Sequence, residues 1–259
     1  LDWSPLDDAL ARARDQGSPI RFWWRDDDAV AATPQLDRLL RLANRYEAGI
    51  ALACIPAHLE PSLVERLHGE ERAFALVHGF SHANHAPSGA KKAEFGAHRP
   101  IETMAQEATS ALERARALLG ERLLPVFVPP WNRIAPALIP ALPRLGYRAL
   151  SAFRDRHAPR TAEGLLVVNT HVDPIDWHGT RSLADPDGLI RSLADAVERR
   201  LSGEADALEP IGFLTHHLVH DEKLWTFCEN LLVYLSRNDA IFATVGGLPY
   251  DKNGITADP

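Results

Sequence analysis

The stretch Phe74-Ala75-Leu76-Val77-His78-Gly79-Phe80-Ser81-His82-Ala83-Asn84-His85 places three histidines directly after a short apolar run. Short apolar runs are typical of buried strands, so the histidines are expected where a strand ends. If the chain turns helically there, His78, His82 and His85 share one face, because positions i, i+4 and i+7 align at about 3.6 residues per turn. Imidazoles on one face favour a metal such as zinc, and the alternative is a polar cap on a loop.

Similar apolar runs alternate with helical patterns along the chain. The expected strands are 19–24, 49–55, 74–77, 124–128, 148–152, 165–169 and 211–215, with a further strand-like run at 241–245. The expected helices are 5–16, 34–46, 61–68, 101–119, 136–145, 186–201 and 221–236. Nearly continuous apolar strands that alternate with helices are typical of a parallel sheet covered by helices. The sequence therefore predicts an α/β fold, a single distorted (β/α) barrel of about seven parallel strands, with 1–259 forming one domain.

Composition excludes several classes of function. The chain has 259 residues and a net charge of −7, which disfavours a nucleic-acid partner. No apolar run approaches the length of a membrane span. Residues 1–8 lack the pattern of a signal peptide, and Cys54 and Cys228 lie in apolar or helical runs, so we expect buried thiols and a cytoplasmic location. The pattern predicts no particular oligomeric state.

Polar clusters follow five of the predicted strands. They are 25–28, 78–85, 129–133, 173–177 and 216–217. In a parallel barrel the loops at the carboxyl ends of the strands converge on one mouth, so these clusters are expected to meet in space.

Three aspartates follow the first strand. If that strand continues, Asp26 and Asp28 point one way and Asp27 the other. One carboxylate with two imidazoles is a catalytic zinc set that leaves a position for water, and a second carboxylate nearby could take the proton of that water. The alternative is a solvated acidic turn.

In order along the chain, these clusters resemble the five motifs of the polysaccharide deacetylase family (NodB homology, carbohydrate esterase family four), over roughly residues 20 to 220. The first motif, a base followed by a metal ligand, resembles Asp27-Asp28, with Asp26 in place of an aromatic residue. The second, two histidines separated by three residues, matches His78 and His82, with Gly79 where serine or threonine is usual.

The remaining motifs match with one departure. Asp173 to Trp177 matches the fourth motif, and Leu214 to His216 matches the fifth. The third motif, Arg-x-Pro followed by an aromatic residue, resembles 128–131, but Val128 stands where the family has an arginine that orients the catalytic aspartate. Arg25 and Arg133 are the candidates to replace it.

The resemblance implies one divalent metal ion, zinc first, held by Asp28, His78 and His82. It implies Asp27 as general base, with Asp26 as the alternative, and His216 as general acid. The residues that we expect to bind substrate are Trp131, Asn132, Arg133, Asp176, Trp177, Leu214 and His85, although His85 has two further readings, as a replacement ligand or as a packing residue. The residues that we expect to support the site are Asp26, Arg25 and Asp173.

The resulting expectation is a metal-dependent hydrolase that removes an N-acyl group, first N-acetyl, from a saccharide containing an amino sugar or from a small acylated amine. An O-acetyl esterase, a deformylase and a small-molecule amidohydrolase are alternatives within the same chemistry. A non-catalytic carbohydrate-binding module is a fourth alternative, and the missing arginine favours it.

Overall fold

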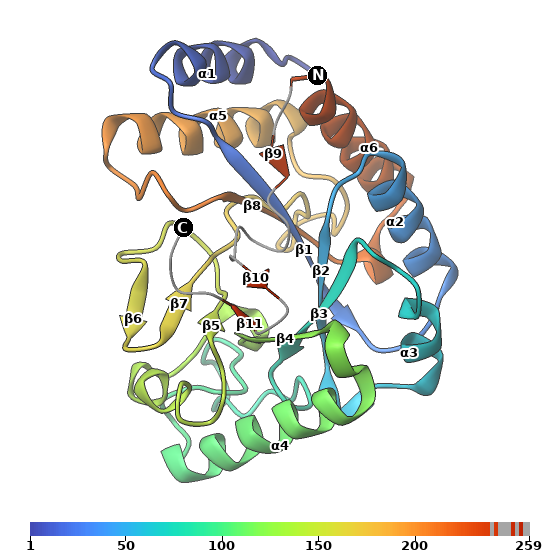
Figure 1. Ribbon diagram of the computed structural model, residues 1–259, viewed down its shortest axis with the longest axis vertical. Helices are drawn as coiled ribbons and strands as arrows, with labels where there is room; N and C mark the ends of the chain where they lie inside the picture. The colour runs from blue at the N-terminus through green and yellow to red at the C-terminus, as the bar shows by residue number, and fades with distance from the viewer. Residues whose placement is uncertain (239–240, 243–249, 252–253, 256–259) are drawn as a thin grey trace.

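The computed structural model describes residues 1–238, 241–242, 250–251 and 254–255, which are arranged around a mostly parallel sheet (Figure 1). The strands of this sheet are β1 Arg21–Ala29, β2 Ile50–Cys54, β3 Ala73–His78, β4 Leu123–Val128, β5 Ala149–Leu150, β6 Arg160–Ala162, β7 Leu165–Val167, β8 Ile211–Thr215 and β9 Ile241–Phe242. Their order is β6-β7-β5-β4-β3-β2-β1-β8, with β9 beside β1, and β6–β7 is the antiparallel pair. β10 Tyr250–Asp251 and β11 Gly254–Ile255 form a separate antiparallel pair.

The segment after β7 brings the two ends of the sheet together. Val172 forms a parallel bridge with Phe213 of β8, and Thr170 forms one with Phe153, just after β5. The N–H of Leu214 donates to the carbonyl of Val172 at 2.8 Å. The predicted α/β fold with parallel strands in a barrel-like arrangement is confirmed.

Among the described residues, six α-helices lie outside the strands (Figure 1). They are α1 Ser4–Asp15, α2 Pro34–Arg45, α3 Pro61–Leu67, α4 Ile101–Leu119, α5 Pro186–Ser202 and α6 Glu222–Arg237, and the 3₁₀ turns are η1 Pro56–His58, η2 Gly120–Arg122, η3 Pro130–Asn132, η4 Pro136–Ala141 and η5 His217–Val219. The side chains of Thr33, Asp185 and Asp221 accept backbone N–H groups and so cap α2, α5 and α6. In the described part of the chain, no helix is both long and apolar enough to cross a membrane.

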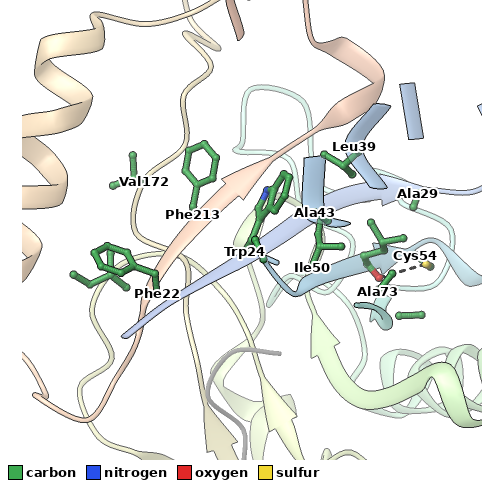
Figure 2. Packing of buried hydrophobic residues seen from close by; sticks show 14 of the residues in the cluster. Phe22, Trp24, Ala29, Leu39, Ala43, Ile50, Cys54, Ala73, Val172 and Phe213 are labelled. Atoms are coloured by element: carbon green, nitrogen blue, oxygen red, sulfur yellow. Dashed lines mark hydrogen bonds between the residues drawn. The ribbon is translucent and has the colours of Figure 1, made fainter. Parts of the chain in front are cut away.

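Alternate strand side chains enter two different cores. Phe22, Trp24 and Phe213 belong to the larger outer cluster, which fills the space between strands and helices (Figure 2). Trp23 belongs to a smaller inner cluster, whose members from β2 are Ala51 and Ala53. The period of two along each strand therefore sends every second residue of β1 into the barrel interior.

The predicted elements differ from the structure in a few places. The sequence predicts a helix over 136–145, but the structure has only the 3₁₀ turn η4, because Pro140 cannot donate the hydrogen bond that an α-helix needs. The hairpin β6–β7 is not predicted, and β1 continues to Ala29. Of the strand-like run 241–245, the structure describes Ile241–Phe242, and 243–245 lie outside the described residues. Cys54 and Cys228 are buried and free, as predicted.

We expect Gly212→Ala to lower the free energy of unfolding by about 1–3 kcal/mol. A Cβ at Gly212 would lie 2.6 Å from the carbonyl oxygen of Asn169 and from the Cα of Thr170, in the segment that joins the two ends of the sheet. Urea denaturation followed by circular dichroism measures the change. The control Leu208→Ala removes an exposed side chain and should alter stability by less than about 0.5 kcal/mol. Equal midpoints for the two variants would contradict the close approach.

Candidate functional site

The end of β1 departs from regular strand geometry at Asp28. The φ angle of Asp28 is 74°, and the pairing of β1 with β2 shifts register between Asp27 and Ala29. Such a bulge with a left-handed residue re-aims the side chain that follows it. Asp28 therefore turns to the side of Asp27, toward His78. The predicted alternation, with Asp26 and Asp28 on one side, is wrong for this reason.

Asp28, His78 and His82 form a cluster of potential metal ligands at the carboxyl ends of β1 and β3. The Oδ1 atom of Asp28 lies 3.2 Å from Nε2 of His78 and 3.4 Å from Nε2 of His82. His78 Nδ1 lies 3.0 Å from the carbonyl of Val128, and donation to that carbonyl leaves the lone pair on Nε2. Asp28 Oδ1 is buried without a hydrogen-bond partner among the described residues. An orphaned carboxylate oxygen beside two imidazole nitrogens fits a divalent cation.

The protonation of this cluster follows from its buried charges. Burial raises the pKa of Asp28, but the adjacent His78 imidazole and the charges of His216 and His82 outweigh burial and hold that pKa well below its usual range. Burial lowers the pKa of His78, but Asp27 and Asp28 outweigh it and raise that pKa overall. Burial dominates at His82 and lowers its pKa. The site therefore carries negative charge that attracts either a proton or a metal cation.

The histidine stretch is a turn and not a helix. Gly79 and His82 both have left-handed φ angles, of 58° and 57°, and these reversals bring His82 back toward His78. His85 is exposed and lies outside the ligand cluster, and its N–H donates to the carbonyl of Ala93. The predicted common helical face for the three histidines is wrong, because the backbone reverses before His85 can join the other two.

Glu94 fixes this turn, and the sequence reasoning did not identify that role. Its carboxylate is buried and accepts the Ser81 N–H at 2.8 Å, the Ser81 hydroxyl at 3.0 Å and the Phe80 N–H at 3.2 Å. A Cβ at Gly79 would lie 2.1 Å from Glu94 Oε2, so the space of a serine or threonine side chain is already taken. The signal in the sequence was that Glu94 is a single acidic residue between the apolar residues Ala93 and Phe95.

The remaining two aspartates have separate partners. Both oxygens of Asp27 accept from Arg25, at 2.8 and 3.0 Å, and both side chains are almost fully buried. Asp26 faces the outer core, where its carboxylate accepts the Thr215 hydroxyl at 2.6 Å and the His217 N–H at 2.9 Å and contacts His217 Nδ1 at 2.5 Å. With three partners on the far side of the strand, Asp26 does not meet the cluster.

His216 lies at the carboxyl end of β8, beside an aromatic wall. Its ring meets that of Trp177 edge-on, with centroids 4.8 Å apart, and the indole N–H of Trp177 donates to Asp173 at 2.7 Å. Burial raises the pKa of Asp173, although the charge of His216 and the Trp177 hydrogen bond oppose this. The charge of His216 also contributes to the low pKa of Asp28. β8 pairs with β1 up to Asp26 and Thr215, so His216 follows the strand beside the one that carries Asp27 and Asp28.

Trp131 forms another wall of the site. Its ring lies 4.3 Å from that of His82, and Trp131 and Asn132 have left-handed φ angles of 56° and 55°. Arg133 donates to the Lys92 carbonyl at 2.7 Å, and the Lys92 ammonium lies 6.0 Å above the Trp131 ring. The turn after β4 and the loop after β3 are therefore joined at the mouth.

Two predicted substrate-binding residues have structural partners. The carboxylate of Asp176 accepts the N–H groups of Gly179 and Thr180, at 3.0 and 2.9 Å, and so closes its own turn. Leu214 is buried on β8, one residue before the outward-facing Thr215. Neither residue joins the ligand cluster.

A second group of potential ligands, Asp155, His171 and Glu209, lies near the start of β8. Arg200 already supplies a cation there, with one guanidinium nitrogen 3.0 Å from His171 Nε2 and another 3.3 Å from Asp155. His171 Nδ1 accepts the Gly212 N–H at 2.8 Å. The arrangement is that of an internal ion network rather than of a second metal site.

Comparisons with known proteins identify the fold. No family model and no curated protein matches the chain. Solved structures do match: a Mycobacterium smegmatis protein assigned as a polysaccharide deacetylase is 14% identical with a TM-score of 0.60, over 89% of this chain and 88% of that one. A family 4 carbohydrate esterase from Streptomyces lividans, in complex with acetate, is 15% identical with a TM-score of 0.55, over 85% of this chain and 90% of that one.

The chain has the polysaccharide deacetylase fold. A further match is a mutant of a family 4 pseudoenzyme with restored activity, at 11% identity and a TM-score of 0.56, over 86% of this chain and 65% of that one. At such identities the likeness establishes the deacetylase fold and not the chemistry, which depends on the side chains at the mouth.

We expect the purified protein to bind about one zinc or similar divalent ion per chain, because the three ligand atoms lie within 4.8 Å of one another. The double variant His78→Ala/His82→Ala should lose this metal in elemental analysis. His85→Ala is the matched control, since it removes an exposed imidazole from the same loop, and it should keep the metal. His171→Ala should also keep it, and loss of metal there would contradict the ion-network interpretation.

We expect His220 to make the metal-free protein less stable in acid. Burial lowers the pKa of His220 to about 4, from an ordinary 6.5. The unfolded chain therefore takes up this proton more readily, and the free energy of unfolding should fall as the pH drops from 6.5 toward 4, by at most about 1.4 kcal/mol per unit. Urea denaturation of His220→Phe in EDTA should show a shallower decline than wild type. His68→Phe, at an exposed histidine, should match wild type, and identical slopes for all three proteins would contradict the burial effect.

Proposed function

We propose that this protein is a metal-dependent hydrolase that removes an N-acyl group, first N-acetyl, from a saccharide containing an amino sugar. The observation that carries the proposal is the Asp28, His78 and His82 cluster, together with a separate buried carboxylate, Asp27, and with His216 directly after the strand that pairs with β1. A binding site has no need of metal ligands, an oriented carboxylate and a nearby imidazole together.

The proposed roles follow from the chemistry of amide hydrolysis. Asp28, His78 and His82 would hold a divalent ion, which would supply Lewis acidity for the hydrolysis. Asp27 accepts a proton from the attacking water, and its two-point ion pair with Arg25 fixes the direction of the carboxylate. The water oxygen joins the acyl carbon, the carbon–nitrogen bond breaks, and His216 gives a proton to the departing amine nitrogen. The products are a carboxylic acid and a free amine.

The walls of the site suit a sugar ring. Trp177 is partly exposed beside His216, and Trp131 lies against His82 on the other side of the mouth. Flat aromatic faces pack well against the apolar face of a pyranose. The backbone N–H of Trp131 is the candidate donor to the developing oxyanion, by resemblance to the family.

An O-acetyl esterase is the second candidate, because one structural neighbour is described as a carbohydrate esterase. Amide hydrolysis requires protonation of a poor leaving group and so depends on His216 more than ester hydrolysis does. Turnover of an N-acetylated and an O-acetylated sugar, measured side by side, separates the two functions. A ratio of kcat/KM that favours the ester and is insensitive to His216→Ala would select the esterase.

We expect the zinc-loaded protein to release acetate from N-acetylated chitooligosaccharide. Asp27→Asn and His216→Ala should each lower kcat by about 10²–10⁴-fold, since each removes a proton-transfer group. An enzyme-coupled acetate assay measures the rates, and His68→Ala, at an exposed histidine on the end of α3, serves as control. Full activity in both Asp27→Asn and His216→Ala would contradict the assigned roles. Saccharide binding without any acetate release would favour the binding-module alternative.

A further inference from the structure

The position at which the resemblance leads one to expect an arginine is Val128, at the end of β4. Its side chain is fully buried in the inner cluster with Trp23 and Ala53. β4 contains no lysine or arginine, and the carbonyl of Val128 is occupied by His78. The charge that orients Asp27 must therefore come from another element.

Arg25 on β1 supplies that charge from only two residues away. Residues i and i+2 of a strand point to the same side, so Arg25 and Asp27 both face the barrel interior. Nε donates to Asp27 Oδ1 at 2.8 Å and Nη2 donates to Oδ2 at 3.0 Å, with the guanidinium fully buried. A two-point pair of this kind fixes the direction of the carboxylate as well as its charge.

Small residues line the barrel interior that Arg25 faces. Arg25 pairs in register with Ala51 and Asp27 pairs with Ala53, both on β2, and Ala149 of β5 lines the same inner cluster. Larger side chains at these alanines would compete for the volume that the guanidinium fills.

The other donors of Arg25 extend the pair into a wider clamp. Nη1 donates to the Ser151 hydroxyl at 2.7 Å and to the carbonyls of Ser151 and Ala152, both at 3.2 Å. Nη2 also donates to Asn132 Oδ1 at 2.8 Å. One buried side chain thus contacts Asp27, the left-handed turn that carries Trp131, and the end of β5.

We propose that Arg25 takes over the orientation of Asp27 from the third-motif arginine, and that the same guanidinium sets the Trp131 turn through Asn132 and is itself anchored by Ser151. Arg25, Asn132 and Ser151 are then positioning residues, which act on the reaction through Asp27 and Trp131. This inference rests on the proposed deacylation.

As a consequence, the base and the oxyanion donor are connected differently than they would be by an arginine on β4. An arginine on β4 would position the base from the neighbourhood of the oxyanion donor. Here the base and its arginine lie on one strand, and the hydrogen bond from Arg25 to Asn132 attaches the Trp131 turn to them. The direction of Asp27 is therefore set by β1 and β5, while the turn after β4 is adjusted to it.

The test is a double-mutant cycle on zinc-loaded protein, with acetate release from N-acetylated chitooligosaccharide as the readout. Arg25→Lys keeps the charge but loses the two-point geometry, and we expect kcat to fall about 10²-fold with KM changed less than about threefold. In the Asp27→Asn background, Arg25→Lys should lower the residual kcat less than about threefold, because the group that it orients is already gone. Zinc content should remain about one per chain in each variant.

Ser151→Ala tests the same inference with a second variant, because it removes the hydroxyl that accepts a hydrogen bond from Arg25. It should lower kcat about tenfold in the wild-type background and less than about threefold in the Asp27→Asn background. If Arg25→Lys does not fold, as judged by zinc content and circular dichroism, the Ser151 cycle decides. Equal losses in both backgrounds, or no loss in wild type, would overturn the inference. Absence of acetate release by wild type would instead overturn the proposed function.

Discussion

The left-handed backbone at Asp28 is the constraint on which the site depends. In a regular strand Asp27 and Asp28 would project to opposite faces, one into the barrel and one among the outer helices. The bulge between Asp27 and Ala29 places both carboxylates at the mouth, where they have different tasks. Asp28 meets the two histidines, and Asp27 is held by Arg25. A non-glycine residue at such a φ angle persists only because surrounding contacts impose it, and it is a common feature of functional sites.

Asp26, which precedes the bulge, has a structural role. Asp26 accepts donors from Thr215 and from the backbone of His217, the two residues that flank His216. It thereby joins β1 to the end of β8 in the outer core. Three successive aspartates thus reach three sets of partners: the first fixes the strand that carries His216, the second is oriented within the barrel, and the third meets the imidazoles.

The sequence predicted the parallel strands and the convergence of five polar clusters because both follow from short-range patterns. Apolar runs mark strands, and chain direction places their carboxyl ends together. Asp27, Asp28, His78 and His82 were assigned from spacing and resemblance, and the structure brings Asp28, His78 and His82 together, with Asp27 adjacent on β1.

What the sequence did not predict depends on backbone reversals and long-range partners. Asp28 and His82 have left-handed φ angles, but neither is a glycine, so the residue types did not predict these angles. Glu94 and Ser151 act on residues 13 and 126 positions away, and only the folded chain brings those partners together. The choice between Arg25 and Arg133 was likewise open in the sequence, because either could reach Asp27 in some fold. Arg133 instead donates to the Lys92 carbonyl, which leaves Arg25 as the partner of Asp27 in the described residues.

The two groups of histidine and carboxylate side chains show why residue type alone does not define a metal site. Asp155, His171 and Glu209 offer imidazole and carboxylate groups, as Asp28, His78 and His82 do, although in the reverse proportion. Arg200 lies among Asp155, His171 and Glu209, where its positive charge balances the two carboxylates. Burial also lowers the pKa of His171, which favours the neutral imidazole. No arginine or lysine contacts Asp28 among the described residues, its Oδ1 has no hydrogen-bond donor there, and its close neighbours are the imidazoles of His78 and His82. A site that already contains a guanidinium gains little from a metal cation, whereas a carboxylate with no such partner can bind one.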